Sequence, residues 1–207
     1  MRISKSIYRI LSKLKEYKSR KRVQFVCNSR HPQMNVLAYG EGNEIHIGDQ
    51  SHTMDSICKF YGTNCKLIIG NNCIIKDVTF WFEGEGGLIE IGSNVTIEEA
   101  QIACVDDKHI TIGNDCMFSR GISMVTTDSH SILDSEGNRI NSDASIELAS
   151  HIWVGANVRI LKGVTIGENV VIGAESLVVK SIPAHCVVAG IPAKVLKSGT
   201  NWTRTRL

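Results

Sequence analysis

Residues 153–176 read WVGANVRILKGVTIGENVVIGAES, and an aliphatic residue followed by glycine recurs within this stretch. The glycines that follow an aliphatic residue stand at positions 155, 167 and 173, so successive copies are twelve and six residues apart. In most copies Asn or Asp follows two residues after the glycine, and further copies begin at Ile47, Ile69, Ile91 and Ile112. A repeat with a fixed period indicates a stack of identical structural units.

The spacing predicts short strands joined by corners, because six residues hold a strand and a turn but not a helical hairpin. Gly48, Gly70, Gly92 and Gly113 follow at steps of 22, 22 and 21, which fits a coil of three hexapeptides with a few inserted corner residues. We expect each glycine to adopt positive φ at a corner, with the nearby Asn or Asp tolerating left-handed geometry. The aliphatic residue before each glycine and the residue three positions after it should both point inward. Those later residues are small: Cys73, Val95, Cys116, Val158, Val170 and Ser176.

Over residues 45–197 this pattern resembles the left-handed parallel β-helix of the hexapeptide-repeat acyltransferases. The left hand is implied by the resemblance alone, since ordinary parallel crossovers are right-handed. We therefore expect an all-β fold, with a β-helix domain over residues 23–197, a short amphipathic helix before it and a tail over residues 198–207. A β-helix alone does not establish an activity, because the same fold can be a scaffold.

Composition agrees with one compact domain. The chain has 207 residues, of which 43% are hydrophobic and only 6% aromatic, so we expect a continuous core without large side chains. No apolar run approaches the roughly twenty residues of a membrane span, and the N-terminus lacks the apolar core of a signal peptide. Seven cysteines without close paired spacing indicate a reduced, cytoplasmic protein.

The N-terminus is strongly basic. Residues 1–22 hold nine of the 23 Lys and Arg residues and one of the 21 acidic residues. Apolar residues recur there at helical spacing, which predicts an amphipathic helix with a basic face. Two interpretations are open: the helix packs on the first coils, or it contacts an anionic membrane surface or a negatively charged acceptor. Nucleic acid is not expected as a partner, because no recognition motif accompanies the basic segment.

The chemistry is expected where the repeat is interrupted, between Gly113 and Gly155. The polar, turn-rich segment at about residues 126–146 predicts a loop that leaves the coil, and loops on rigid scaffolds often carry function. Asp128 and His130 are separated by one residue, so in an extended segment both side chains would lie on the same side. A carboxylate beside an imidazole can fix its tautomer and raise its basicity, as a general base requires.

Three segments in this order, residues 127–130, 137–141 and 151–155, resemble the active-site region of sugar and polysaccharide O-acetyltransferases. The resemblance implies that His130 deprotonates the acceptor hydroxyl and that Trp153 flanks acyl donor and acceptor. The indole N–H of Trp153 or a backbone N–H could donate to the oxyanion of the tetrahedral intermediate. His151 is a candidate for orienting the loop by a hydrogen bond. No covalent acyl-enzyme is required for this direct transfer.

The same resemblance implies acetyl-coenzyme A as co-substrate and a homotrimer whose sites lie between adjacent subunits. The phosphates of coenzyme A require cations and backbone donors, and small residues leave room for its pantetheine arm. The candidate residues for binding coenzyme A are Trp153, Gly155, Lys162, Gly173, Ala174, Lys180, Pro192, Ala193 and Lys194. The tail near Trp202 is expected to pack close to a subunit edge.

We therefore predict an acetyl-coenzyme A dependent O-acetyltransferase acting on a surface sugar or polysaccharide, such as a capsule. The acceptor, neutral or anionic, is not encoded in the loop composition. Three alternatives are open: an N-acetyltransferase acting on an amino sugar nucleotide, a metal-dependent hydratase on the same fold, and a non-catalytic scaffold or glycan-binding protein. No ligand-spaced set occurs among the seven His residues, so no metal site is predicted.

Overall fold

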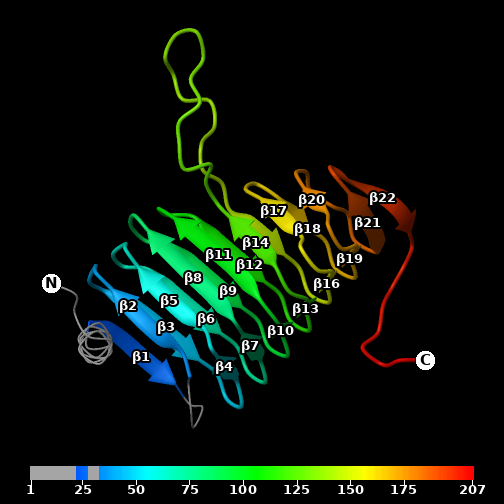
Figure 1. Ribbon diagram of the computed structural model, residues 1–207, viewed down its shortest axis with the longest axis horizontal. Coiled ribbons are helices and arrows are strands. Elements are labelled where there is room, and N and C mark those ends of the chain that lie inside the picture. The colour runs from blue at the N-terminus through cyan, green and yellow to red at the C-terminus, as the bar shows by residue number, and fades with distance from the viewer. Residues whose placement is uncertain (1–21, 28–32) are drawn as a thin grey trace, which may run out of the picture.

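Short parallel strands wind into a three-sided coil in the computed structural model, which describes residues 22–27 and 33–207 (Figure 1). From β2 to β20 every third strand joins the same sheet, so three sheets run along the coil. The first sheet holds β1 (Val23–Cys27), β3 (Asn43–Ile47), β6 (Lys66–Ile69), β9 (Leu88–Ile91), β12 (His109–Ile112), β15 (Ile146–Leu148) and β18 (Thr165–Ile166). The second holds β2 (Asn35–Ala38), β5 (Ile57–Phe60), β8 (Val78–Glu83), β11 (Ala100–Val105), β14 (Ile122–Val125), β17 (Arg159–Leu161) and β20 (Leu177–Val178).

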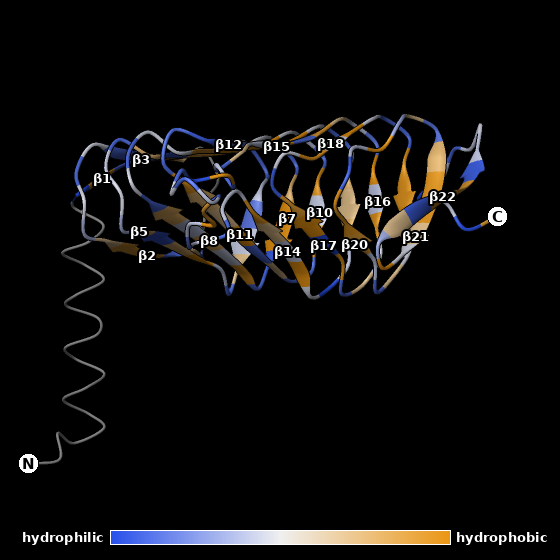
Figure 2. Ribbon diagram, turned by 90° about the horizontal axis from the view of Figure 1, so that it is seen from above, coloured by the Kyte–Doolittle hydropathy of each residue, from blue (hydrophilic) through white to orange (hydrophobic). Residues whose placement is uncertain are grey.

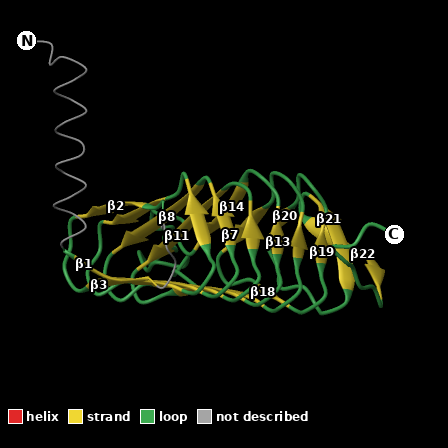
Figure 3. Ribbon diagram, turned by 90° about the horizontal axis from the view of Figure 1, so that it is seen from below, coloured by secondary structure: helices red, strands yellow, loops and turns green. Residues whose placement is uncertain are grey.

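The third sheet ends differently from the other two. It holds β4 (His52–Met54), β7 (Ile74–Lys76), β10 (Thr96–Ile97), β13 (Met117–Phe118), β16 (Trp153–Val154), β19 (Val171–Ile172), β21 (Cys186–Gly190) and β22 (Ala193–Ser198). Its last strand, β22, pairs antiparallel with β21, whereas the other strand pairs are parallel. The antiparallel strand therefore closes the C-terminal end of this sheet. Figure 3 shows only strands and loops among the described residues.

The corners correct one expectation about the repeated glycines. Positive φ is found at the Asn or Asp two residues later, for example 56° at Asn72 and 60° at Asn94, and not at Gly70 or Gly92. A Cβ on Gly70 would lie 2.7 Å from the carbonyl carbon of Gly92 in the next coil. The expected positive φ at these glycines was wrong. Glycine is needed there because neighbouring coils approach too closely for a side chain.

Side-chain oxygens join successive corners. The Oδ1 of Asn71 accepts the backbone N–H of Asp49 at 2.8 Å, and the Oγ of Ser93 accepts the N–H of Asn71 at 3.0 Å. Asn114 continues this ladder by accepting the N–H of Ser93 at 2.8 Å. Polar residues after the glycine therefore satisfy backbone donors that the corner would otherwise leave unpaired.

The core follows the predicted inward positions but holds larger side chains than expected. Residues before and three after the glycines, such as Ile69 and Cys73, are buried. Four phenylalanines are also fully buried, which contradicts the expectation of a core without large side chains: Phe60, Phe80, Phe82 and Phe118. Phe60 and Phe82 stack across neighbouring coils at 4.9 Å between ring centroids. Figure 2 shows the hydrophobic residues concentrated in the strands.

Two further sequence-based expectations concern cysteines and the N-terminus. None of the seven cysteines, all of which lie in described segments, forms a disulfide. The basic helix predicted over residues 1–22 lies outside the described residues except for Arg22. Among residues 22–27 and 33–207, no helix has the length and apolar character needed to cross a membrane.

Candidate active site

Residues 126–145 leave the coil between β14 and β15 and project from it, as the break in the repeat predicts (Figure 1). The tip is a turn in which the Oδ1 of Asp134 accepts the N–H groups of Glu136 and Asn138, each at 2.9 Å. These two bonds hold the pKa of Asp134 below its usual range, with the bond to Asn138 as the largest cause. The N–H of Ile140 donates to the carbonyl of Ile132 at 2.8 Å, so the two arms of the loop are paired.

The base of the loop is held by Lys162, Asp128 and Asn141. The ammonium of Lys162 lies 2.6 Å from Oδ2 of Asp128 and donates to the carbonyl of Asn141 at 2.8 Å. The amide of Asn141 donates to Asp128 Oδ2 at 2.9 Å and to the carbonyl of His130 at 2.8 Å. The bond from Lys162, followed by that from Asn141, lowers the pKa of Asp128. Residues from three parts of the chain therefore fix the segment that carries His130.

His130 lies on this fixed segment with its side chain exposed. Its N–H donates to the carbonyl of Asp128 at 2.7 Å, and Ser129 between them has φ of 65°. These features make a γ-turn, a tight and strained conformation for a residue other than glycine. The segment is thus not extended as expected, and the Asp128 carboxylate bonds to Lys162 and Asn141 instead of the imidazole. Asp128 is therefore linked to His130 through Asn141 and the loop backbone.

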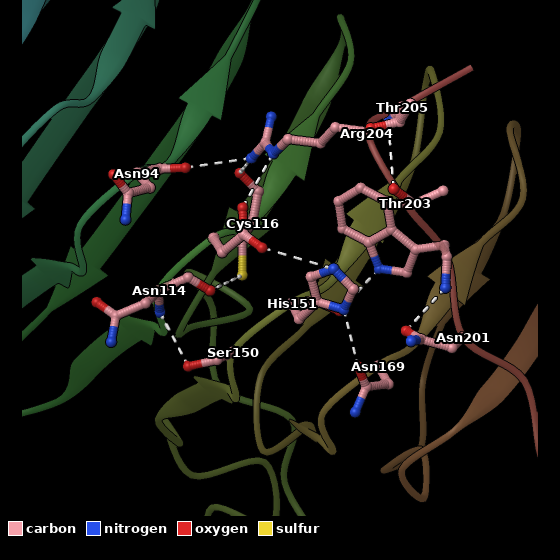
Figure 4. Close-up of polar contacts among 12 residues, drawn as sticks. Asn94, Asn114, Cys116, Ser150, His151, Asn169, Asn201, Thr203, Arg204 and Thr205 are labelled. Carbon is pink, nitrogen blue, oxygen red and sulfur yellow. Dashed lines mark hydrogen bonds and ion pairs between the residues drawn. The ribbon is translucent and has the colours of Figure 1, made fainter. Parts of the chain in front are cut away.

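Trp153 lies in β16 of the third sheet. His151 lies at the corner before this strand, where the C-terminal tail packs against it (Figure 4). The indole N–H of Trp202 donates to the carbonyl of His151 at 2.8 Å, and the two rings stack at 4.3 Å. Nδ1 of His151 lies 2.8 Å from Oδ1 of Asn169. Trp153 is 42% exposed and lies 6.1 Å from Trp202 between ring centroids. The contacts of His151 among the described residues are with the tail and neighbouring corners, which corrects the expectation that it orients the loop.

Arg204 fastens the tail beyond Trp202 (Figure 4). Its guanidinium donates to Oδ1 of Asp115 at 3.0 Å and to the carbonyl oxygens of Asn94 and Cys116 at 3.1 and 2.9 Å. Trp202 itself is 8% exposed, so the tail buries a large aromatic side chain against its own coils. The tail thereby supplies one wall of the surroundings of Trp153.

Known proteins with similar sequences and structures show the family of this chain. No family model matches the chain. A polysialic acid O-acetyltransferase from Escherichia coli O1:K1 / APEC is 35% identical over 122 residues, which cover 58% of this chain and 40% of that protein. A galactoside O-acetyltransferase from Lactococcus lactis is 36% identical over 156 residues, covering 74% of this chain and 70% of that protein. The solved structure of the polysialic acid O-acetyltransferase OatWY superposes with a TM-score of 0.86 at 30% identity, covering 90% of each chain.

The chain belongs to the hexapeptide-repeat acyltransferases. Within that family these relatives are O-acetyltransferases of sugars and polysaccharides. The predicted fold class, a left-handed parallel β-helix with one protruding loop, is confirmed. The aligned region spans less than half of the E. coli relative.

The predicted binding residues for coenzyme A divide into packed and exposed sets. Gly155 is needed by the coil, because a Cβ there would lie 2.6 Å from the backbone nitrogen of Ala174. Lys162 is committed to the loop base. The exposed members lie on the last coils and the β21–β22 hairpin: Ala174, Lys180, Pro192 and Lys194. Gly173 and Ala193 are partly buried beside them.

Sequence reasoning missed two residues that the fold places beside grooves of the second sheet. Arg159 in β17 lines a groove together with Asn157, Glu175 and Ile191. Among the described residues its guanidinium has no hydrogen-bond or ion-pair partner, so it adds a cation to the C-terminal coils. Trp81 in β8 lines a cavity that reaches the loop. Both residues alternate with inward-facing neighbours, so strand periodicity could have shown that they point outward.

The structure does not bring all candidate site residues together within one chain. The loop with His130 leaves the coil between a strand of the second sheet and a strand of the first, whereas Trp153 lies on the third sheet. Among the described residues no contact joins His130 to Trp153. Over the same residues, no group of three His, Cys, Asp or Glu side chains is arranged to hold a metal ion.

Proposed function

We propose that this chain transfers an acetyl group from acetyl-coenzyme A to a hydroxyl group of a surface sugar or polysaccharide. The observation that carries the proposal is the exposed imidazole of His130 on a loop fixed at its base by Lys162, Asp128 and Asn141. A general base must be accessible to its substrate and held in one place. The names of the relatives, which act on polysialic acid and on galactosides, support this class of acceptor.

The proposed reaction is a direct transfer. The imidazole of His130 accepts the proton of the acceptor hydroxyl while the hydroxyl oxygen forms a bond to the thioester carbonyl carbon. The carbonyl oxygen carries the negative charge of the tetrahedral intermediate and accepts a hydrogen bond from the indole of Trp153 or a backbone N–H. Collapse breaks the carbon–sulfur bond, and the departing thiolate takes the proton from the imidazolium. The products are the acetyl ester and free coenzyme A.

We also propose that the active unit is a homotrimer with its sites between subunits. Three observations support this arrangement: His130 and Trp153 lie on different sides of one coil, the loop projects away from its own chain, and it exposes apolar side chains. Ile132, Leu133 and Ile140 are 56%, 57% and 62% exposed, which is costly for an isolated arm in water. A neighbouring subunit would cover them and supply Trp153 to the site.

For coenzyme A we propose the groove side of the last coils, where Lys180, Lys194 and Arg159 provide cations and Ala174 leaves space for the pantetheine arm. Point charges and guanidinium groups are suited to phosphate.

A role of residues 1–22 in acceptor use and a cytoplasmic location, peripheral to the membrane, stay predictions. The role of residues 1–22 is tested by removing them and comparing activity on long and short acceptors. We expect a selective loss of activity on long acceptors.

The decisive experiment compares His130→Ala with His52→Ala, a matched exposed histidine in β4. Release of free thiol from acetyl-coenzyme A is followed with polysialic acid, galactosides and an amino sugar as acceptors. We expect His130→Ala to lower kcat by about a hundredfold to ten-thousandfold, the usual contribution of a general base, with oligomer size and coenzyme A binding unchanged. His52→Ala should match the parent. Near-parental turnover by His130→Ala refutes the mechanism, and preference for the amino acceptor would favour N-acetylation.

A further inference from the structure

Three aromatic side chains form a row on the outer face of the second sheet, far from the coenzyme A candidates in sequence. Tyr39, Tyr61 and Trp81 come from successive coils, and the rings of Tyr39 and Tyr61 stack at 5.0 Å with an interplanar angle of 12°. The ring of Trp81 follows 4.4 Å from that of Tyr61. Both tyrosines are more than 40% exposed. Contiguous exposed apolar surface marks interaction and ligand-binding sites.

The row ends at Trp81, and a cavity begins there. Across the sheet, the residues in register with Trp81 are Ala103 in β11 and then Val125 in β14. Small side chains at these positions leave a cavity of about 400 Å³, lined by Trp81, Ala103, Val125, Thr127 and Ser129 among others. Trp81 is therefore both the last ring of the row and one wall of an open space.

The lining has the chemistry of a site for a sugar ring. Trp81, Ala103 and Val125 are apolar, while Thr79, Gln101 and Lys59 add hydrogen-bonding groups around them. The face of an aromatic ring carries partial negative charge and attracts the polarised C–H groups of a pyranose, whose hydroxyls point outward to polar partners. The ammonium of Lys59 lies 5.6 Å from the centroid of the Trp81 ring, and Glu83, which accepts the indole N–H of Trp81 at 3.3 Å, also lines the cavity, so the lining carries a charge of each sign.

The cavity continues into the loop that carries the proposed base. Thr127 and Ser129 line it, and Ser129 is the central residue of the γ-turn that ends at His130. A ring in the cavity would therefore have its hydroxyls beside the same segment that positions the imidazole. The described strands β8, β11 and β14 and the base of the loop lie next to one another in Figure 1.

We propose that Trp81 is the platform on which a pyranose ring of the acceptor polysaccharide stacks, as the next ring of the row formed by Tyr39, Tyr61 and Trp81. This inference rests on the proposed function, because it assigns the acceptor side of that site. Trp81 sets the affinity for the acceptor and takes no part in proton transfer. Lys59 and Gln101 contact the substituents of the ring.

The test separates acceptor binding from catalysis. All binding measurements use the His130→Ala protein as the parent. Calorimetry compares this parent with the same protein carrying Trp81→Ala, Trp81→Phe or Tyr39→Ala, for binding of polysialic acid and of a galactoside. Tyr39 is the matched control, because it belongs to the row but does not line the cavity. We expect Trp81→Ala to weaken binding by about tenfold or more, and the other two changes to stay within about threefold.

Steady-state kinetics gives the second measurement. With the catalytic histidine intact, Trp81→Ala should raise the KM for the acceptor and leave the KM for acetyl-coenzyme A unchanged. Equal binding by Trp81→Ala and the parent, or no saturable binding of either glycan by the parent, overturns the proposal. Loss of the oligomer in Trp81→Ala with acceptor binding retained also overturns it, since the row would then be a subunit contact. Failure of transfer with glycan binding still dependent on Trp81 would instead reject only the proposed function.

Discussion

Replacement of Gly70 by alanine tests the physical reason for the repeated glycine. A Cβ at this position would meet the carbonyl carbon and oxygen of Gly92 at 2.7 Å and the nitrogen of Ser93 at 2.8 Å. All three atoms belong to the backbone of the next coil, so no side chain can move aside. Reaching an ordinary carbon–carbon contact of about 3.5 Å requires the coils to separate locally by roughly 0.8 Å.

The cost follows from the bonds that this separation disturbs. The N–H of Gly70 donates to the carbonyl of Ile91 at 2.8 Å, and a shift of that size takes the bond beyond normal hydrogen-bond length. Overpacking costs about 1–3 kcal/mol and a lost backbone hydrogen bond about 1 kcal/mol. The free energy of unfolding should therefore fall by about 2–4 kcal/mol. For a chain of this size, that corresponds to a Tm lower by roughly 5–15 °C.

Thermal unfolding followed by circular dichroism measures the effect at one fixed protein concentration. The matched control is Gly137→Ala, at the tip of the loop, where nothing lies within 4 Å of an added Cβ but φ is 85°. Strain there is confined to the loop, so its Tm should change by less than about 3 °C. A Gly70→Ala protein that melts within about 2 °C of the parent would show that the coils are not held at this spacing, and equal shifts for both variants would point to backbone conformation instead.

Three further predictions concern the loop, the tail and the core. Lys162→Met removes the cation that holds Asp128, so we expect faster proteolysis within residues 126–145 and a lower kcat with the KM for acetyl-coenzyme A retained; an equally resistant loop contradicts this role. Lys162 lowers the pKa of Asp128 in the folded protein, so their ion pair stabilises the loop fully above the ordinary Asp pKa of about 3.9. This stabilisation is lost as the pH falls through the lowered folded pKa. Hydrogen exchange should therefore show the loop opening at low pH in the parent, and this pH-dependent step should be absent from Lys162→Met. Trypsin should cleave the tail faster in Trp202→Ala than in the parent, and Trp202→Phe should be cleaved at an intermediate rate. Equal cleavage rates in all three proteins would exclude the docking contact. Burial raises the pKa of Cys104 to about 12 and that of Cys116 to about 11, so neither thiol should alkylate at pH 8 until the protein unfolds, as mass spectrometry can verify.

The prediction for Asp128 shows why site geometry was harder to infer than site location. The break in the repeat located the loop, because a missing period is visible in the chain itself. The position of the Asp128 side chain depends on Lys162 and Asn141, which are far from it in sequence. A single positive φ at Ser129 then redirects the backbone, and nothing in an Asp-Ser-His segment announces that turn.

The roles of His151 and Lys162 show the same limit. Motif order placed His151 near the chemistry and the charge of Lys162 made it a candidate for binding coenzyme A, but the structure uses His151 to dock Trp202 and Lys162 to fasten the loop. These contacts join segments 51 and 21 residues apart. Short motifs cannot specify such pairings, because many side chains of suitable polarity compete for them.

The sequence by itself determined the coil, its inward positions and the place where it is interrupted, because each depends on a periodic pattern that every turn of the chain repeats. Only the tertiary structure decided why the repeated glycines are needed, which contacts hold His130, and that Trp81 ends a row of rings beside the loop. The physical reason is the stacking of coils: residues about 22 positions apart become neighbours at strand spacing, and the close approach of Gly70 to Gly92 exists only in the stack.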